Sequence, residues 1–461
     1  MESAGGTSEG GAGAANPAPP AAPDPAQIVK TNQWAALLVL GALIGVPVAA
    51  FAYGFLKVIA EAQKFFFTTF PEDLGWNSAP VWWPVPVLAL GGLLAALAIT
   101  YLPGTAGHKP AEGFKTGGGP VTPAELPGVI LAALATLCFG FVLGPEAPLI
   151  AIGSGLGVIA VRLLKRDAPM QATVVIAVAG SFGAVSALLG SPLVGAFLLM
   201  EASGLAGAMM SAVLLPGFLA AGVGSLVFVG LNSWTGWGTL SLAIPDIPPF
   251  SSPTFVEFLW AIVIGLTAPL LGTAIKRLAL TLQPIVERRR VALMPLLGVA
   301  VAGLAIAFGQ ATDKAASEVL FSGQNALPGL VQDAAAWSVG SLLLLVLLKG
   351  LAYSLSLSAF RGGPVFPGMF IGAVGGIAFS HLPGLPMIAG VAIGIAAMTT
   401  TMLGLPFTAV LLTALFLSAD GLQLMPLAIV GAVISFAVSV RIAPVIPPDE
   451  PEHAVAQAAP A

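Results

Sequence analysis

Apolar segments of membrane-spanning length follow one another from about residue 34 to residue 440, separated by short polar loops. Only 8% of the residues are charged, against about 25% in an ordinary soluble domain. Lipid offers the backbone no hydrogen-bond partner, so only helices and closed barrels can span a bilayer. Because these segments have helical length, the sequence predicts an all-α polytopic membrane protein, multi-pass in the plasma (inner) membrane.

The chain contains 56 glycines and 39 prolines, which is many for a simple helix bundle. They predict broken, tilted and closely crossing helices, an arrangement in which the ends of half-helices face a polar pathway. Cys138 is the one cysteine of the sequence and is expected to be a small packing residue. The three histidines are scattered, so we expect no metal site, and we predict no cofactor, no enzyme activity and no nucleic-acid partner.

Composition divides the chain into three regions. Residues 1–28 and 444–461 are rich in Pro and Ala, and both are predicted to be disordered tails. Residues 29–443 between them form one transmembrane domain. Within this domain, basic residues cluster in two loops, at 162–166 and 276–290. The positive-inside rule places both loops in the cytoplasm.

Glu146 is the acid that most needs an explanation. It stands in the segment GPEAP, residues 144–148, between two apolar runs. An ionised carboxylate at membrane depth costs about 3 kcal/mol on insertion scales, so a functional role is the default. The prolines suit the first turn of a helix, whose unpaired N–H groups form an anion site. Glu146 would then be a tethered anion that competes with a free one. The alternative is a carboxylate at the membrane surface or hydrogen-bonded inside the bundle.

Two parts of the chain are similar to each other. GPEAP at Gly144 matches GPVFP at Gly363, an offset of 219 residues (363 minus 144). Further on, GSPLVGAFLL from Gly190 resembles GLPFTAVLLT from Gly404, an offset of 214 (404 minus 190). Two registers in the same order indicate a duplication. The repeats would cover about residues 85–231 and 293–440.

Duplication with broken helices is the design of transporters that bind their substrate near the middle of the membrane, between inverted repeats. The two motif helices, beginning near Pro148 and Pro367, are therefore expected to enter the membrane with opposite orientations. Their N-termini should meet near its centre, with Glu146 close to Phe366.

The same segments resemble the motifs of the CLC family of chloride channels and proton/chloride antiporters. GPEAP is similar to the family's G-(K/R)-E-G-P, GPVFP to G-x-F-x-P, and GTAGHKP to G-S-G-I-P. SPLVGAFLLMEA resembles the A-P-L-A-G segment, and the resemblance covers roughly residues 34–440. It implies a divergent bacterial-type member without a cytoplasmic regulatory domain. The implied fold is two inverted repeats in a homodimer within the lipid bilayer, with one pathway per subunit for a small inorganic anion such as chloride.

Carried over position by position, the resemblance makes Glu146 the gate of this pathway. The anion-binding positions that it implies are Gly144, Ala147, Gly107, Thr105, Val365 and Phe366. Gly107 stands where the family has a serine that coordinates the ion, with Thr105 nearby as a substitute hydroxyl. Pro145 and Pro364 each remove a backbone N–H from the expected donors. The family's pore tyrosine has no counterpart, because the three tyrosines lie elsewhere in the sequence.

Proton coupling in the resembling antiporters depends on an inner glutamate after A-P-L-A-G. Our alignment puts Ala202 at that position and Glu201 one residue before it. Glu201 is thus either the candidate proton acceptor or a carboxylate at a cytoplasmic helix end, solvated or paired with a base. Lys349, inside an apolar run, is expected either to reach an interface or to line the pathway.

These observations predict transport of chloride or a similar small anion, passive and channel-like. Two alternatives stay open: a proton-coupled anion antiporter, and a non-conducting scaffold that kept the fold and lost the pore.

Overall fold

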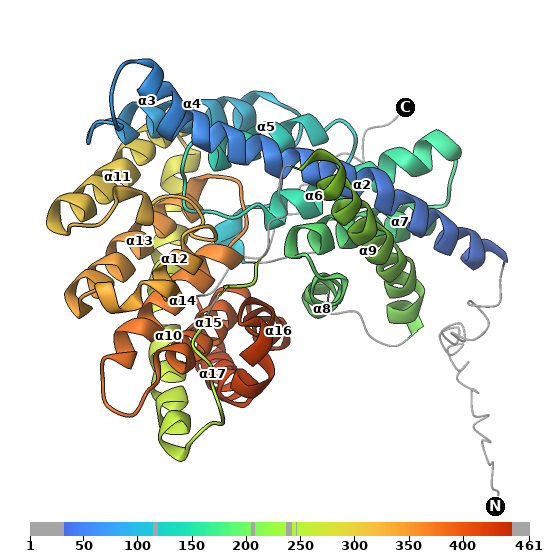
Figure 1. Ribbon diagram of the computed structural model, residues 1–461. Helices are drawn as coiled ribbons and strands as arrows, with labels where there is room; N and C mark the ends of the chain where they lie inside the picture. Colours follow the sequence, from blue (N-terminus) through green and yellow to red (C-terminus); the bar gives the residue numbers. More distant parts are fainter. Residues whose placement is uncertain (1–31, 114–118, 204–207, 237–241, 246, 445–461) are drawn as a thin grey trace, which may run out of the picture.

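The computed structural model describes residues 32–113, 119–203, 208–236, 242–245 and 247–444 (Figure 1). Regular structure in this part of the chain is helical, and nine of its helices are long and apolar enough to cross a membrane. The predicted all-α polytopic class is confirmed. The predicted tails, 1–28 and 444–461, lie outside the described residues apart from Pro444.

The first half of the domain begins with a long helix that continues through a π-helical turn for 42 residues. The helices of this half are α2 (Asn32–Lys64), α3 (Phe70–Asp73), α4 (Pro84–Tyr101), α5 (Leu126–Leu137), α6 (Glu146–Leu164), α7 (Met170–Leu189), α8 (Pro192–Ser203) and α9 (Ala208–Thr235). Helix α2 packs along α7 and α9.

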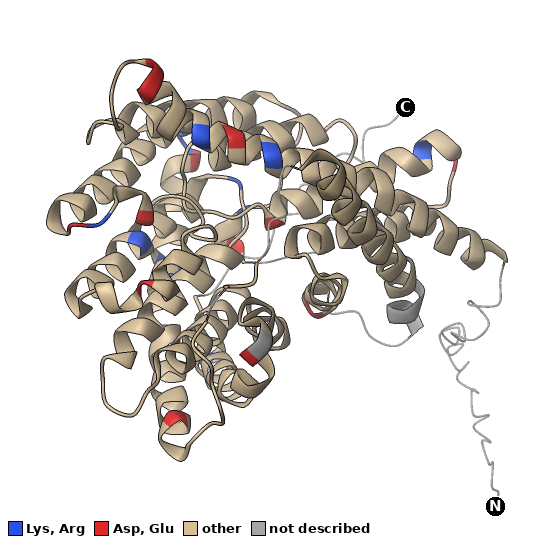
Figure 2. Ribbon diagram, viewed as in Figure 1, with Lys and Arg blue, Asp and Glu red and all other residues tan. Residues whose placement is uncertain are grey.

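The second half also combines long helices with short ones. They are α10 (Phe255–Glu287), α11 (Arg290–Ala311), α12 (Leu327–Gln332), α13 (Val339–Ala359), α14 (Val365–Ser380), α15 (Met387–Leu403), α16 (Pro406–Phe416) and α17 (Gly421–Ile442). In Figure 1 these helices form one side of the molecule, while α6 to α9 form the other. Charged side chains are few, and Figure 2 shows long stretches of helix without any.

Some element boundaries differ from those expected. The sequence has an apolar run at about 191–231 that could be taken for one segment, but it forms two helices, α8 and α9. The run 127–143 is helical only as far as Leu137. The motif helices begin at Glu146 and Val365, two residues before the expected prolines, because proline is tolerated within the first turn of a helix.

Paired glycines bring α6 against α7 and α14 against α15. A Cβ atom at Gly153 of α6 would overlap the carbonyl oxygen of Gly180 in α7, and the reverse also holds. In the second repeat, Gly372 of α14 and Gly394 of α15 oppose each other in the same way. These pairs are related by the sequence offsets of 219 and 214, so the duplication extends to helix packing. Small residues are what allow membrane helices to approach this closely.

The two repeats meet through equivalent residues. Gly144 and Gly363 exchange two backbone hydrogen bonds, of 2.8 and 2.6 Å, in an antiparallel bridge. Three residues earlier, Phe141 and Phe360 stack with their ring centroids 3.7 Å apart. Each pair is separated by 219 residues, which is the offset of the duplication. Helices α6 and α14 begin just after the bridge, so their N-termini lie together, as expected of inverted repeats.

Gly372→Ala should destabilise the fold by more than about 2 kcal/mol, because the added methyl group would overlap a backbone carbonyl. Gly375 is the matched control, since a Cβ atom at that position of the same helix meets nothing within 4 Å. Gly375→Ala should be neutral or stabilising by up to about 1 kcal/mol, because alanine favours a helix. Thermal unfolding of the two purified variants in detergent measures the difference. Equal stabilities would show that the glycine contact is not a tight one.

Candidate functional site

The carboxylate of Glu146 lies at the junction of the two repeats. Glu146 is the first residue of α6, and its side chain is fully buried. Its Oε1 accepts a hydrogen bond of 2.9 Å from the backbone N–H of Phe366, in the first turn of α14. Its Oε2 has no hydrogen-bond partner among the described residues. A carboxylate of the first repeat thus occupies the donor end of a helix in the second repeat, and a helix N-terminus favours anions.

Glycines surround this carboxylate because there is no room for a side chain. A Cβ atom added at Gly144 would overlap both carboxylate oxygens of Glu146, and one at Gly363 would overlap Oε2. The bridge between the repeats and the carboxylate therefore share one small space. Three of the sequence-derived anion positions, Gly144, Val365 and Phe366, are brought together here.

Two further sequence-derived positions, Thr105 and Gly107, belong to a loop that reaches the junction through Arg361. The Nε and Nη2 atoms of Arg361 both donate to the carbonyl oxygen of Thr105, at 3.1 and 2.9 Å. The hydroxyl of Thr105 donates to the carbonyl of Gly107 at 3.4 Å, so it is bonded within its own loop. Ala147, the remaining position, follows Glu146 in the first turn of α6 and is half-buried.

Helix α13 supplies polar contacts that the sequence analysis missed. The hydroxyl of Tyr353 is buried and donates to the carbonyl of Pro364, directly before α14, at 2.8 Å. The hydroxyl of Ser356 accepts a hydrogen bond of 3.1 Å from the backbone N–H of Val142. With Lys349, these residues recur at intervals of four and three, which places them on one face of the helix. That spacing of polar residues within an apolar run was the available signal.

Lys349 neither reaches an interface nor stands free in a pathway. Its side chain is fully buried, and its Nζ donates to the carbonyls of Glu318 and Leu320 at 2.8 and 2.9 Å. Longer bonds of 3.3 Å go to the two other carbonyls of the same segment, 318–321. The ammonium group also lies 4.5 Å from the ring centroid of Phe370 in α14. Burial raises the pKa of the nearby Glu318 carboxyl, and the positive charge of Lys349 opposes that rise.

The carboxylate of Glu201 binds backbone groups of the second repeat. Its Oε1 accepts the backbone N–H of Phe407 at 3.0 Å, and its Oε2 accepts the N–H of Thr408 at 2.7 Å. The hydroxyl of Thr408 donates to the same Oε2 at 2.6 Å. The carboxylate at the end of α8 therefore satisfies the open N–H groups in the first turn of α16. The partners found for this helix-end carboxylate are two backbone N–H groups and one hydroxyl of the second repeat.

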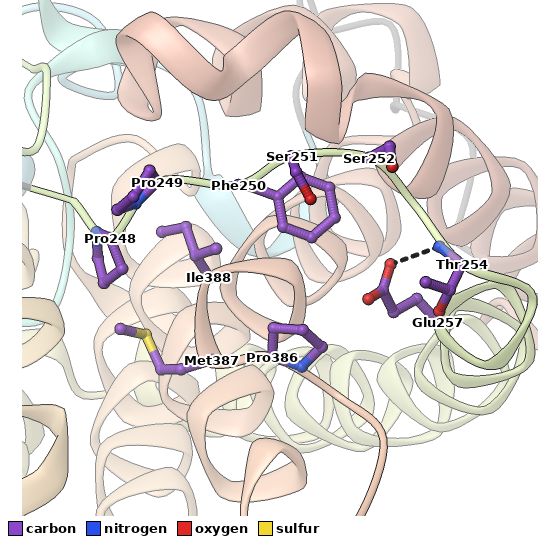
Figure 3. A pocket seen from close by; sticks show the side chains of 10 residues that line it. All are labelled: Pro248, Pro249, Phe250, Ser251, Ser252, Thr254, Glu257, Pro386, Met387 and Ile388. Carbon is purple, nitrogen blue, oxygen red and sulfur yellow. Dashed lines mark hydrogen bonds between the residues drawn. The ribbon is translucent and has the colours of Figure 1, made fainter.

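One pocket of about 290 Å³ lies away from these residues, between the segment before α10 and the start of α15 (Figure 3). It is lined mainly by residues 248–252 and 386–388, with Thr254 and Glu257 at one end. The Glu257 carboxylate accepts the backbone N–H of Thr254 at 2.9 Å and so serves as a helix cap. The pocket does not include Glu146, so we do not assign the candidate site to it.

A protein family model matches most of the chain. The model described as voltage gated chloride channel covers residues 91–440. The chain belongs to this family. Among curated proteins, the relatives of this chain include YfeO of Escherichia coli O7:K1, a protein named for ion transport. It is 28% identical over 348 residues, which cover 74% of this chain and 79% of YfeO.

Solved CLC structures have the same fold. A slow cyanobacterial Cl⁻/H⁺ antiporter aligns with a TM-score of 0.68 at 17% identity, over 88% of this chain and 97% of that one. A CLC-type fluoride/proton antiporter aligns with a TM-score of 0.63 at 19% identity, over 89% and 96%. The predicted CLC fold of two inverted repeats is confirmed, and the chain is an integral multi-pass membrane protein of a family that carries anions.

Lys349→Met should destabilise the protein by more than about 3 kcal/mol, because it leaves four carbonyls of segment 318–321 without their donor. Lys57→Met is the control, since Lys57 is only partly buried and pairs with the exposed Glu61 of the same helix at 2.7 Å. A surface pair of this kind contributes less than about 1 kcal/mol. Denaturation in detergent compares the two variants. If the Lys349→Met protein is as stable as Lys57→Met, the hydrogen bonds of the buried ammonium to segment 318–321 do not stabilise the fold.

Proposed function

We propose that this protein carries chloride or a similar small anion across the membrane, through a pathway gated by Glu146. The supporting observation is the buried carboxylate at the N-terminus of α14, with one oxygen bonded to the Phe366 N–H and the other unpaired. A carboxylate held in this way is a tethered anion. It occupies the donors that a free anion would use, so the two compete for one site.

The gating step is an exchange of one anion for another. When Glu146 is ionised, its carboxylate fills the space between Gly144 and Gly363. When it is protonated or displaced, the side chain moves away and a free anion takes the α14 N–H groups. The pathway belongs to a single subunit, and we propose that two subunits form a homodimer.

The arrangement around Glu201 supports passive transport over proton coupling. Both carboxylate oxygens of Glu201 are engaged by α16, so carrying a proton would mean giving up the cap. Ala202, the residue aligned with the inner glutamate of the family, cannot bind a proton. The proton-coupled antiporter remains the second candidate, because two CLC structures with this fold are those of proton antiporters. A non-conducting scaffold is the third.

Glu146→Gln should keep or increase anion flux and should remove most of its dependence on external pH, because glutamine cannot ionise. Flux of chloride from proteoliposomes, followed across a range of external pH, measures both properties. Glu257→Gln is the matched control, since Glu257 is also buried and also accepts a backbone N–H near the start of a helix. It should leave flux and pH response unchanged.

Two results would contradict the gate. One is a folded Glu146→Gln protein that no longer conducts. The other is a variant whose pH response equals that of the wild type. A wild type that passes no anion from a panel of halides would favour the scaffold.

A chloride gradient alone should drive little proton movement, because Glu201 is committed to α16. Proton uptake into vesicles, recorded with a pH-sensitive dye while an opposing chloride gradient is imposed, tests this. Glu201→Gln should then change stability but not the ratio of ions moved. Strong uphill proton uptake that disappears in Glu201→Gln would assign the protein to the antiporters and make Glu201 the proton acceptor.

A further inference from the structure

Equivalent positions of the two repeats face each other around the bridge, and most of them carry similar residues. Phe141 corresponds to Phe360, and the Gly144–Pro145 pair corresponds to Gly363–Pro364. The backbone contacts are equivalent as well. The N–H of Val142 donates to the hydroxyl of Ser356 in α13, and the N–H of its counterpart, Arg361, donates to the hydroxyl of Thr136 in α5.

Charge breaks this symmetry at two positions. Glu146 in the first repeat corresponds to Val365 in the second, and Arg361 in the second corresponds to Val142 in the first. Each repeat therefore carries one charged side chain that the other repeat lacks, and the two charges are of opposite sign. Arg361 lies two residues before Gly363, and Gly363 abuts the Glu146 carboxylate.

The guanidinium of Arg361 is bonded only to carbonyls in the described part of the chain. It is 5% exposed, and besides Thr105 it donates from Nη1 to Ala359 and Phe360 at 3.4 and 3.3 Å. No carboxylate among the described residues lies within 4.0 Å of it. Carbonyl dipoles orient the group but do not neutralise it. A buried charge that is not balanced costs free energy, so this position calls for an anion nearby.

The two acids that attract the Arg361 guanidinium are already paired with other basic residues. Three charged groups act on the guanidinium electrostatically: Arg290 repels it, and Glu287 and Glu112 attract it. Both acids are paired with Lys109, at 2.9 and 3.8 Å respectively, and Glu287 is also 3.9 Å from Arg290. Two acids and two bases leave that network neutral. That network therefore does not neutralise the positive charge of Arg361, and Gly363, two residues further on, abuts the Glu146 carboxylate.

We propose that Arg361 is the fixed positive charge of the anion site, a positioning and affinity-determining residue that this chain places in its second motif. The proposal rests on the function proposed for Glu146. It also explains how the site works with few donors. Pro145 and Pro364 supply no N–H, and the Thr105 hydroxyl is bonded to its own loop. A guanidinium charge at the junction compensates for both losses, and its two bonds to Thr105 hold the loop against the second motif.

The test measures chloride binding rather than flux. The protein is purified in detergent with Glu146→Gln as the parent, so that no carboxylate competes for the site. Its unfolding temperature is followed as chloride replaces gluconate, because an anion that binds the folded state stabilises it. Arg361→Gln should raise the half-saturating chloride concentration about tenfold or more, whereas Arg361→Lys, which keeps the charge, should stay within about threefold of the parent. Arg277→Gln is the control, since Arg277 is exposed and donates to Ile442 at 3.1 Å. It should not change the binding.

A second measurement does not depend on how well Arg361→Gln folds. Raising the pH from about 7 to about 9 should weaken chloride binding to Arg361→Lys more than to the arginine parent, because burial lowers the pKa of a lysine further into this range than that of a guanidinium. The parent carries the same Glu112, Glu287, Lys109 and Arg290, so their titration is common to both proteins.

Several outcomes would overturn the proposal. Arg361→Gln could bind chloride as tightly as the parent, or Arg361→Lys could respond to pH as the parent does. A parent that shows no halide-dependent stabilisation at all also removes the site that Arg361 would serve. These failures differ from failure of the proposed function. If chloride binding depends on the charge at position 361 but the protein passes no anion, transport is refuted and the role of Arg361 stands. If the protein passes anions but chloride binding does not depend on that charge, transport stands and the role of Arg361 is refuted.

Discussion

The two backbone hydrogen bonds between Gly144 and Gly363 are the contact on which the centre of the molecule depends. They fix the ends of two half-helices against each other within an apolar domain, where an unpaired N–H or carbonyl would be costly. Because neither residue has a side chain, the bridge leaves space for one carboxylate, that of Glu146. The same contact therefore joins the repeats, brings the N-termini of α6 and α14 together and defines the volume of the candidate anion site.

Charged side chains near this centre bond to backbone groups instead of to one another. Glu146 and Glu201 each accept N–H groups at the start of a helix in the other repeat, α14 and α16. Arg361 reaches a carbonyl of the first repeat, and Lys349 binds a run of four carbonyls. Broken helices create such open backbone groups at membrane depth, and long charged side chains can satisfy them. A few charges in this chain thus stabilise the irregular segments that the pathway requires.

The sequence predicted much of the fold because its signals were local. Apolar runs predicted most of the helices. The repeated Gly-Pro segments predicted that Glu146 and Phe366 lie close together, and the Glu146 Oε1 atom is 2.9 Å from the backbone nitrogen of Phe366. The contacts of Glu201 and Lys349 were not predictable in this way. Each depends on which backbone groups a distant segment leaves open, and no pattern in the residues around the charge records that. Arg361 was missed for a related reason: it stood beside a motif, and its partner Thr105 is 256 residues away in the chain.

Duplication explains the geometry of the centre, but symmetry alone cannot make it selective for anions. Two identical motifs would give paired N–H groups and glycines, a weakly positive space open to any small polar group. The departures from symmetry supply the chemistry. In the mechanism that we propose, the carboxylate at position 146 is an internal competitor, which makes occupancy of the site depend on protonation. The guanidinium at position 361, in the role that we propose for it, adds a charge that does not titrate in the physiological range. Glu146 and Arg361 belong to different repeats. Each side chain therefore adds its charge to the centre without replacing the glycines that form the backbone bridge.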